Sequence, residues 1–252
     1  MDVFHDYAYF YNAFYLEKNY VSEAKQVDIL LKKYGKNIKK IMNYGCGTGK
    51  HDIELTKLGY NCSGIDISQI MINLAKENAK NENLPINFSV ADIRNNSLIG
   101  IYDAVISLFH VMSYQNSNED ILRSFGSARN ILNKGGIFLF DIWYGPGVLN
   151  DKPSVRVKEV EDDSYRLMRI AKPIMHDKTN IVDVCYQVLI INKESNESKI
   201  INEKHSMRYF FRPELEYYLN DAGFELLTNI DCRTLGDTNY DSWTSYFVAR
   251  AI

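Results

Sequence analysis

A short glycine-rich stretch, Asn43-Tyr44-Gly45-Cys46-Gly47-Thr48-Gly49, follows a predicted strand and opens a predicted helix. Glycine lets the backbone turn tightly and approach a ligand that a Cβ atom would exclude. A dinucleotide-binding fingerprint needs glycine at position 50, where Lys50 stands. A phosphate-binding P-loop needs glycine at position 44 and Ser or Thr at position 51, where Tyr44 and His51 stand. Both motifs fail, so the GxGxG spacing needs another interpretation.

Short apolar runs alternate with helical patterns on both sides of this loop, between residues 22 and 143. The runs predict five strands, at residues 40–44, 61–65, 86–91, 103–108 and 137–142. Helices are predicted to begin at Ser22, at Lys50, after a Ser68 cap and at Asp120. The helix after Ser68 is expected to bury one stripe of residues, Ile70, Met71, Leu74 and Ala75. Such alternation indicates an α/β fold whose parallel sheet is covered on both faces.

The pattern changes after Trp143. Segments with period-two alternation follow, at residues 156–160, 165–171, 181–191 and 199–211, and they predict an antiparallel meander. Pro213 begins another helix, and two strands near 225–231 and 244–250 complete the sheet. We therefore expect an α/β core made of residues 1–150 and 212–252, interrupted by an antiparallel β insertion at residues 151–211.

Composition narrows the range of partners. The chain has 252 residues, a net charge of −3 and 46% hydrophobic residues, so it can bury a core and lacks the basic excess of nucleic-acid-binding proteins. Its four cysteines form no CxxC pair, and no metal site is expected. No apolar stretch reaches the roughly 20 residues that a membrane span needs. We expect a cytoplasmic protein, monomer or homodimer, that binds a small molecule and neither nucleic acid nor a membrane.

Two carboxylates stand where a nucleoside cofactor would need them. Asp66 ends the second predicted strand, about 20 residues past the loop, where a carboxylate can accept hydrogen bonds from both ribose hydroxyls. Asp92, in Ala91-Asp92-Ile93, follows the third strand. With the GxGxG loop, these markers resemble those of the class I S-adenosylmethionine-dependent methyltransferases.

The resemblance implies a Rossmann-like fold with a seven-stranded, mostly parallel sheet, S-adenosyl-L-methionine as cofactor and S-adenosyl-L-homocysteine as product. In the family, the loop packs against the methionine and ribose parts of the cofactor, and the acidic residue after the third strand meets the adenine. The cofactor-binding residues implied in the core are Gly45, Cys46, Gly47, Asp66, Ile67, Asp92, Ile93 and Leu108. One departure is Asn43, where the family usually has Asp.

The N-terminal segment from Tyr11 to Tyr20 is similar to the lid helix of bacterial small-molecule N-methyltransferases, including those that act on nucleotide-linked amino sugars. In these enzymes a tyrosine contacts the cofactor carboxylate, a role that the resemblance assigns first to Tyr11 and second to Tyr20. The alternative is an aromatic amphipathic helix that packs on the sheet. We take residues 1–21 as this lid.

Methyl transfer from a sulfonium is an in-line displacement, so the protein must align the acceptor and manage one proton. His110, just past the fourth strand, is the candidate base, with a packing role as the alternative. The residues expected to face the acceptor lie in the lid, after the fifth strand and in the insertion: Tyr15, Asp141, Trp143, His205, Arg208 and Tyr209. Arg208 is able to grip a phosphate with two hydrogen bonds.

The resemblance implies N-methylation of a small amine, such as a nucleotide-linked amino sugar or a phosphorylated amino alcohol of the phosphoethanolamine type used in surface polysaccharide, with the insertion covering the acceptor site. One alternative is O-methylation of a sugar or another small hydroxyl compound. The other is a non-catalytic module that only binds S-adenosylmethionine.

Overall fold

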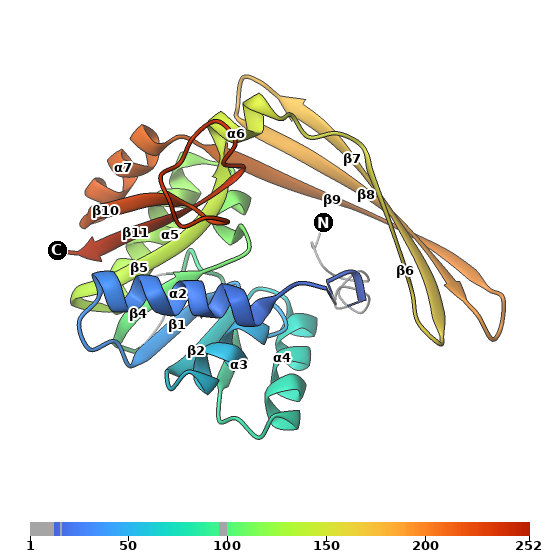
Figure 1. Cartoon of the computed structure of the whole chain (residues 1–252), viewed down its shortest axis with the longest axis horizontal. Coiled ribbons are helices and arrows are strands. Elements are labelled where there is room, and N and C mark those ends of the chain that lie inside the picture. The colour runs from blue at the N-terminus through green and yellow to red at the C-terminus, as the bar shows by residue number, and fades with distance from the viewer. Residues whose placement is uncertain (1–12, 16, 96–99) are drawn as a thin grey trace.

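Figure 1 shows a computed structural model of the chain, which describes residues 13–15, 17–95 and 100–252. The lid predicted over residues 1–21 falls largely outside these ranges, and so does Tyr11. Within the described ranges, no helix combines the length and the apolar character needed to cross a membrane.

Seven strands form the central sheet. β1 (Lys40–Tyr44), β2 (Asn61–Asp66), β3 (Asn87–Val90), β4 (Tyr102–Ser107) and β5 (Leu132–Tyr144) are parallel, in the order β3-β2-β1-β4-β5. β11 (Thr244–Ala251) pairs antiparallel with both β5 and β10 (Phe224–Asp231). The prediction of a mostly parallel seven-stranded sheet is confirmed.

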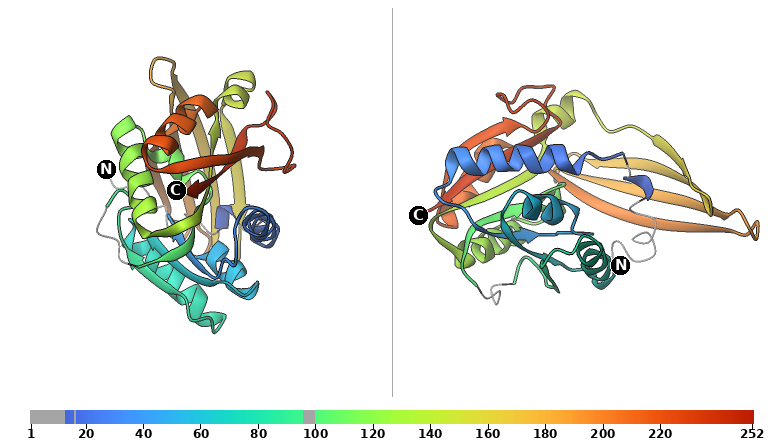
Figure 2. Two further views of the ribbon diagram at one scale, coloured as in Figure 1. Left: turned by 90° about the vertical axis from the view of Figure 1, so that its left-hand side faces the viewer. Right: turned by 60° about the horizontal axis from the view of Figure 1, so that its bottom comes forward.

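Helices cover both faces of this sheet (Figures 1 and 2). On one face lie α2 (Tyr20–Tyr34), α3 (Lys50–Lys57) and α4 (Gln69–Asn81), which pack on residues such as Ile41, Leu139 and Phe88. On the other lie α5 (Asn118–Ile131) and α7 (Arg212–Asp221). Two short helices, η1 (Val111–Tyr114) and α6 (Gly145–Asn150), follow the ends of β4 and β5.

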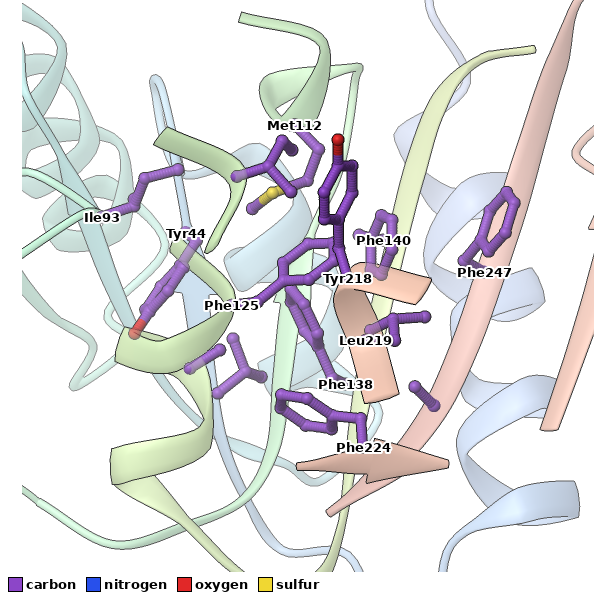
Figure 3. Packing of buried hydrophobic residues seen from close by; sticks show 14 of the residues in the cluster. Tyr44, Ile93, Met112, Phe125, Phe138, Phe140, Tyr218, Leu219, Phe224 and Phe247 are labelled. Carbon is purple, nitrogen blue, oxygen red and sulfur yellow. The ribbon is translucent and has the colours of Figure 1, made fainter. Parts of the chain in front are cut away.

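β5 packs against the helices on both faces of the sheet because alternate side chains of a strand point to opposite faces. Ile137 and Leu139 pack beneath α2, whereas Phe138 and Phe140 enter the cluster of phenylalanines under α5 and α7 that Figure 3 shows. The Phe140 ring lies 4.7 Å from that of Phe138 and 5.5 Å from that of Phe247, measured between centroids.

Three local predictions need correction. α2 begins at Tyr20, with Asn19 as its cap, because the Asn19 side chain accepts the Ser22 amide hydrogen. α5 begins at Asn118, two residues before Asp120, and is capped by Ser117. The buried stripe of α4 consists of Met71, Ile72, Ala75 and Ala79 instead of the predicted Ile70, Met71, Leu74 and Ala75. The helix is turned by about one residue because it packs against Phe88 and α3.

Residues after α6 form four antiparallel strands, β6 (Arg156–Glu161), β7 (Tyr165–His176), β8 (Ile181–Asn192) and β9 (Ser198–Phe210). Figures 1 and 2 show them as a long curved layer that extends well beyond the helices of the core.

The register of β5 places this layer above the core. β4 pairs with β5 only as far as Phe140. Beyond it, Trp143 pairs with Thr244 of β11 on one edge and with Tyr209 of β9 on the other. A strand has two edges, so β9 occupies the edge that β4 has vacated. The antiparallel layer therefore begins over the carboxyl end of β4, where open α/β sheets bind ligands.

We expect the Phe140→Ala variant to lose about 3–5 kcal/mol of unfolding free energy, because it leaves a cavity among buried rings. Urea denaturation followed by circular dichroism measures the change. Tyr240→Ala, at a side chain that is 73% exposed, is the control and should change stability by less than about 0.5 kcal/mol. Equal effects of the two substitutions would contradict the packing described for β5.

Candidate active site

A cavity of about 300 Å³ lies where the glycine loop, the segment after β4 and the antiparallel layer meet. The residues predicted for the site that line it are Tyr15, Tyr20, Gly45, Cys46, Gly47, Asp66, Leu108, His110, Trp143 and His205. Other lining residues were not foreseen: Thr48, Lys50, His51, Met71, Phe109, Val111, Tyr114, Val184, Tyr186, Met207 and Trp243. The size is at the lower end for small-molecule sites.

The glycine loop forms the cavity floor. Gly45 and Gly47 both have positive φ, 68° and 54°, which disfavours any residue with a Cβ atom. A Cβ at Gly45 would meet the Val111 side chain at 2.5 Å. A Cβ at Gly47 would meet no atom within 4 Å among the described residues, so this glycine leaves open space on the cavity side. At these two positions the loop thus offers backbone, without side chains, to a ligand.

Asp66, at the end of β2, braces this loop. Its Oδ2 accepts the Gly47 amide hydrogen at 2.9 Å, and its Oδ1 accepts that of Ser68 at 2.9 Å. Burial raises the pKa of this carboxyl group, although the amide hydrogen bonds oppose the shift. Because a carboxylate has about four acceptor positions, Asp66 can hold both amides and still accept two hydroxyl groups.

Asn43 and Asp52 form a polar pair beneath the loop. The Asn43 amide donates to Asp52 Oδ2 at 2.7 Å. Burial raises the Asp52 pKa to about 7, in spite of the hydrogen bond from Asn43. Within the described residues, Asn43 Oδ1 and Asp52 Oδ1 are both buried without a hydrogen-bond partner, and a proton on Asp52 adds a donor to this pair. Asn43 therefore interacts with a neighbouring acid and not with loop amides.

The residues predicted at the adenine end do not line the cavity. Asp92 is held by Arg94, with Nη2 2.6 Å from Oδ2 and Nε 2.9 Å from Oδ1, and this hydrogen bonding lowers the Asp92 pKa. Ile93 is buried in the core, whereas Ile67 is 64% exposed beside Asp66.

His110 occupies a strained turn after β4. Phe109 and His110 have φ values of 65° and 66°, in the left-handed region that residues with a side chain rarely adopt. The His110 ring lies against Phe109 and Trp143 and lines the cavity. Asp141 of β5 lies behind it, 6% exposed and outside the lining, with Oδ2 3.1 Å from His110 Nδ1. The structure thus places Asp141 against His110 instead of facing an acceptor.

A second imidazole enters the cavity wall from β9. His205 Nδ1 lies 2.8 Å from the Tyr114 hydroxyl, and His205 Nε2 lies 3.1 Å from Glu203 Oε2. This buried chain joins η1 of the core to the antiparallel layer. Period two along β9 was a signal for Glu203, because it puts residues 203 and 205 on the same face.

Arg208 and Tyr209 lie apart from the cavity. Arg208 is 7% exposed, and its guanidinium group donates to Asn118 at 2.8 Å and to Glu214 at 2.9 Å. Tyr209 is buried in a cluster that includes Val148 and Val182. Arg208 thus ties β9 to α5 and α7 and does not reach the cavity.

Charged groups cluster at the cavity mouth beside Tyr20. Glu23 of α2 contacts Lys18, and its Oε2 lies 2.6 Å from His51 Nε2. Burial alone would raise the Glu23 pKa, but His51 and Lys18 outweigh it and hold the value at about 2. Burial lowers the pKa of Lys50 next to them. His51 and Lys50 directly follow the glycine loop, which was the signal for finding them.

Burial of Asp52 leads to a pH-dependent stability. The folded protein retains this proton up to about pH 7, whereas an unfolded chain releases it near pH 3.9. The protonated Asp52 carboxyl group therefore makes its full contribution to the free energy of unfolding below about pH 4, and this contribution is lost as the pH rises toward 7. We expect Asp52→Asn to flatten the stability profile in this window and to exceed the wild type in stability at pH 8, measured by urea denaturation. Asp241→Asn, at an exposed side chain, should leave the slope unchanged. A wild-type slope in Asp52→Asn would contradict the assignment.

Parts of the chain are similar in sequence to known methyltransferases. Residues 41–136 match the model of a methyltransferase domain. The Bacillus subtilis protein YqeM, named as a methyltransferase, is 28% identical over 190 residues that cover 74% of each chain. The dTDP-3-amino-3,4,6-trideoxy-alpha-D-glucopyranose N,N-dimethyltransferase of Streptomyces venezuelae is 23% identical over 88% of this chain and 91% of its own.

The fold is similar to that of a sugar N-methyltransferase of known structure. The X-ray structure of the sugar N-methyltransferase KedS8 from Streptoalloteichus superposes with a TM-score of 0.82 at 18% identity, over 100% of this chain and 96% of the other. Its likeness confirms the fold, and the match to the methyltransferase domain extends over the glycine loop and Asp66. The chain is a class I S-adenosylmethionine-dependent methyltransferase.

Proposed function

We propose that the chain N-methylates a small amine in the cavity beside His110. The observation that carries this proposal is the position of His110, an imidazole on the cavity wall between the glycine loop and the antiparallel layer. Aromatic rings make up much of the remaining wall: Tyr15, Tyr20, Phe109, Tyr114, Trp143, Tyr186 and Trp243. Such rings exclude water and attract cations, which suits an amine that becomes positively charged.

S-adenosylmethionine supplies a methyl group on a positively charged sulfur. The loop residues Gly45 and Gly47 would hold its methionine and ribose parts, and Asp66 would accept hydrogen bonds from the ribose hydroxyls. The exposed Ile67 and the backbone near Asp92 remain our candidates for the adenine. Tyr20 remains the candidate for the carboxylate among the described residues, with Lys50 beside it.

The chemistry of the wall favours nitrogen over oxygen as the acceptor. An amine attacks through a neutral nitrogen, and a histidine is able to take its proton near neutral pH. An alcohol needs a stronger base or a metal. O-methylation of a sugar or another small hydroxyl compound is the second candidate, because the Asp141 carboxylate lies 3.1 Å behind the His110 ring, as in the histidine–carboxylate pairs that activate hydroxyl groups.

We infer the acceptor class from the antiparallel layer and from the relatives. Val184, Tyr186, His205 and Met207 of β8 and β9 line the cavity, so residues 151–211 would cover the acceptor and select it. Two similar proteins are named as an amino-sugar N,N-dimethyltransferase and a sugar N-methyltransferase. A nucleotide-linked amino sugar is therefore the first acceptor to test, and a phosphorylated amino alcohol is the second.

A screen of such amines and matching alcohols with S-adenosylmethionine, read by mass spectrometry, tests the proposal. We expect the amines to give products in which a methyl group has replaced a hydrogen atom, and the alcohols to give none. Products from alcohols would favour O-methylation. Binding of S-adenosylhomocysteine without any product would favour a non-catalytic binding module.

Removal of the Asp66 carboxylate should weaken binding of S-adenosylhomocysteine by about 1.5–3 kcal/mol, as expected for hydrogen bonds to a charged group. Isothermal titration calorimetry of Asp66→Ala measures this loss. Asp103→Ala is the matched control, because Asp103 accepts the amide hydrogens of Lys39 and Lys40 at the amino ends of the parallel strands, away from the cavity. Unchanged affinity in Asp66→Ala would remove this residue from the cofactor site, and tight binding of NADH to the wild type would contradict the cofactor assignment.

Removal of the His110 imidazole should lower kcat by roughly 100- to 10,000-fold with little change in cofactor affinity. Steady-state kinetics of His110→Asn measure the effect. A histidine base works only when neutral, so the acidic limb of the wild-type pH profile should disappear in this variant. His176→Asn is the matched control, since His176 is an exposed histidine that also pairs with an aspartate, Asp183. A higher KM with an unchanged kcat would instead assign His110 to orienting the acceptor.

A further inference from the structure

Asp141 contacts His110 at two points. Its Oδ1 accepts the backbone amide hydrogen of His110 at 2.8 Å, and its Oδ2 lies 3.1 Å from Nδ1 of the His110 ring. We propose that Asp141 is a positioning residue that fixes both the orientation and the tautomer of His110. The proposal rests on the proposed role of His110 as the base, and no sequence motif pointed to this pair.

The two contacts have a fixed direction. A backbone N–H only donates, so Oδ1 acts as acceptor, and an ionised carboxylate has no hydrogen to donate from Oδ2. The His110 Nδ1 atom beside Oδ2 is buried, and a buried nitrogen is costly without a partner. Nδ1 must therefore carry the ring hydrogen. Nε2, on the other side of the ring from Asp141, is left with a lone pair that can accept a proton.

The backbone around His110 needs this support. Phe109 and His110 are two successive residues in the left-handed region, with φ of 65° and 66°, and neither is glycine. Such conformations persist only where the surroundings hold them. Asp141 can hold this turn because its own position is fixed within β5. It pairs with Tyr246 of β11, and its neighbour Phe140 pairs with Ser107 of β4. A strand positions a side chain more firmly than a loop does.

The Nδ1–Oδ2 distance is already that of a hydrogen bond, while the N–H direction still misses the oxygen. A rotation of the ring aligns them, and catalytic hydrogen bonds commonly tighten only when substrate binds. In the step itself, the N–H bond of the methyl acceptor breaks and its electron pair stays on nitrogen. The proton goes to Nε2, and the imidazolium that forms has the Asp141 carboxylate beside its second N–H, as in Ser-His-Asp triads.

Asp141→Asn tests the direction of the hydrogen bonds. The His110 backbone N–H holds the oxygen of the new amide, because the reverse orientation would place two donors together. The amide nitrogen then faces Nδ1 and donates to it, which moves the ring hydrogen to Nε2. Long-range ¹H–¹⁵N correlation spectra of the ¹⁵N-histidine-labelled full chain report this hydrogen directly. We expect Nδ1–H in the wild type and Nε2–H in Asp141→Asn.

The kinetic readout is separate. We expect kcat to fall at least about 100-fold in Asp141→Asn, with S-adenosylhomocysteine affinity within about twofold of the wild type. Asp183→Asn, which removes the carboxylate beside His176, should change the His176 signal and leave that of His110 and kcat unaltered.

The possible outcomes separate the two proposals. A wild-type His110 with its hydrogen on Nε2 overturns the positioning role without the need for any variant, and so does an unchanged tautomer in Asp141→Asn. A changed tautomer with an undiminished kcat supports the positioning role and overturns His110 as the base.

Discussion

β5 pairs both with strands of the central sheet and with β9 of the antiparallel layer, and the rest of the structure depends on this double pairing. Residues 137–140 of this strand lie between β4 and β11 and bury Phe138 and Phe140 in the core. Its last residues, Trp143 and Tyr144, pair with β9 on the edge that β4 no longer occupies. The antiparallel layer is therefore attached by backbone hydrogen bonds at the carboxyl end of the parallel sheet. The cavity there has the glycine loop on one side and the antiparallel layer on the other, and Asp141 lies on the strand that joins the two sheets.

Polar groups are buried around this cavity in small sets whose members contact one another. Asp66 accepts two backbone amides, His205 joins Tyr114 and Glu203, and Asp141 contacts His110 twice. Burying such groups costs free energy unless each finds a partner, so each set holds its members in one geometry. Most of these anchoring residues lie on strands, which resist movement more than loops do. These contacts place most of the polar groups of the cavity in advance, and such placement lowers the entropic cost of aligning reactants.

Much of the fold could be predicted because its signals are local. Apolar periodicity located the strands and helices of the core, and period two located β6–β9. Errors arose where neighbouring elements decide the outcome. The stripe of α4 is turned toward Ile72 and Ala79 because Phe88 and α3 lie on that side. η1 and α6 have no repeating pattern, since each is a single short turn after the end of a strand. Asn19 replaces the expected start at Ser22 because a cap depends on one side-chain hydrogen bond.

The sequence by itself determined the glycine loop, the carboxylate of Asp66 and the location of His110 after a strand. Each follows from local rules: glycine where φ is positive, and ligand-binding groups at the carboxyl ends of parallel strands. Only the tertiary structure decided which side chains meet. It pairs Asp141 with His110, joins His205 to Tyr114, and holds Arg208 between Asn118 and Glu214. The physical reason is strand register. A shift of one residue along β5 or β9 would turn every side chain to the opposite face, and the register is set by contacts between residues far apart in the chain.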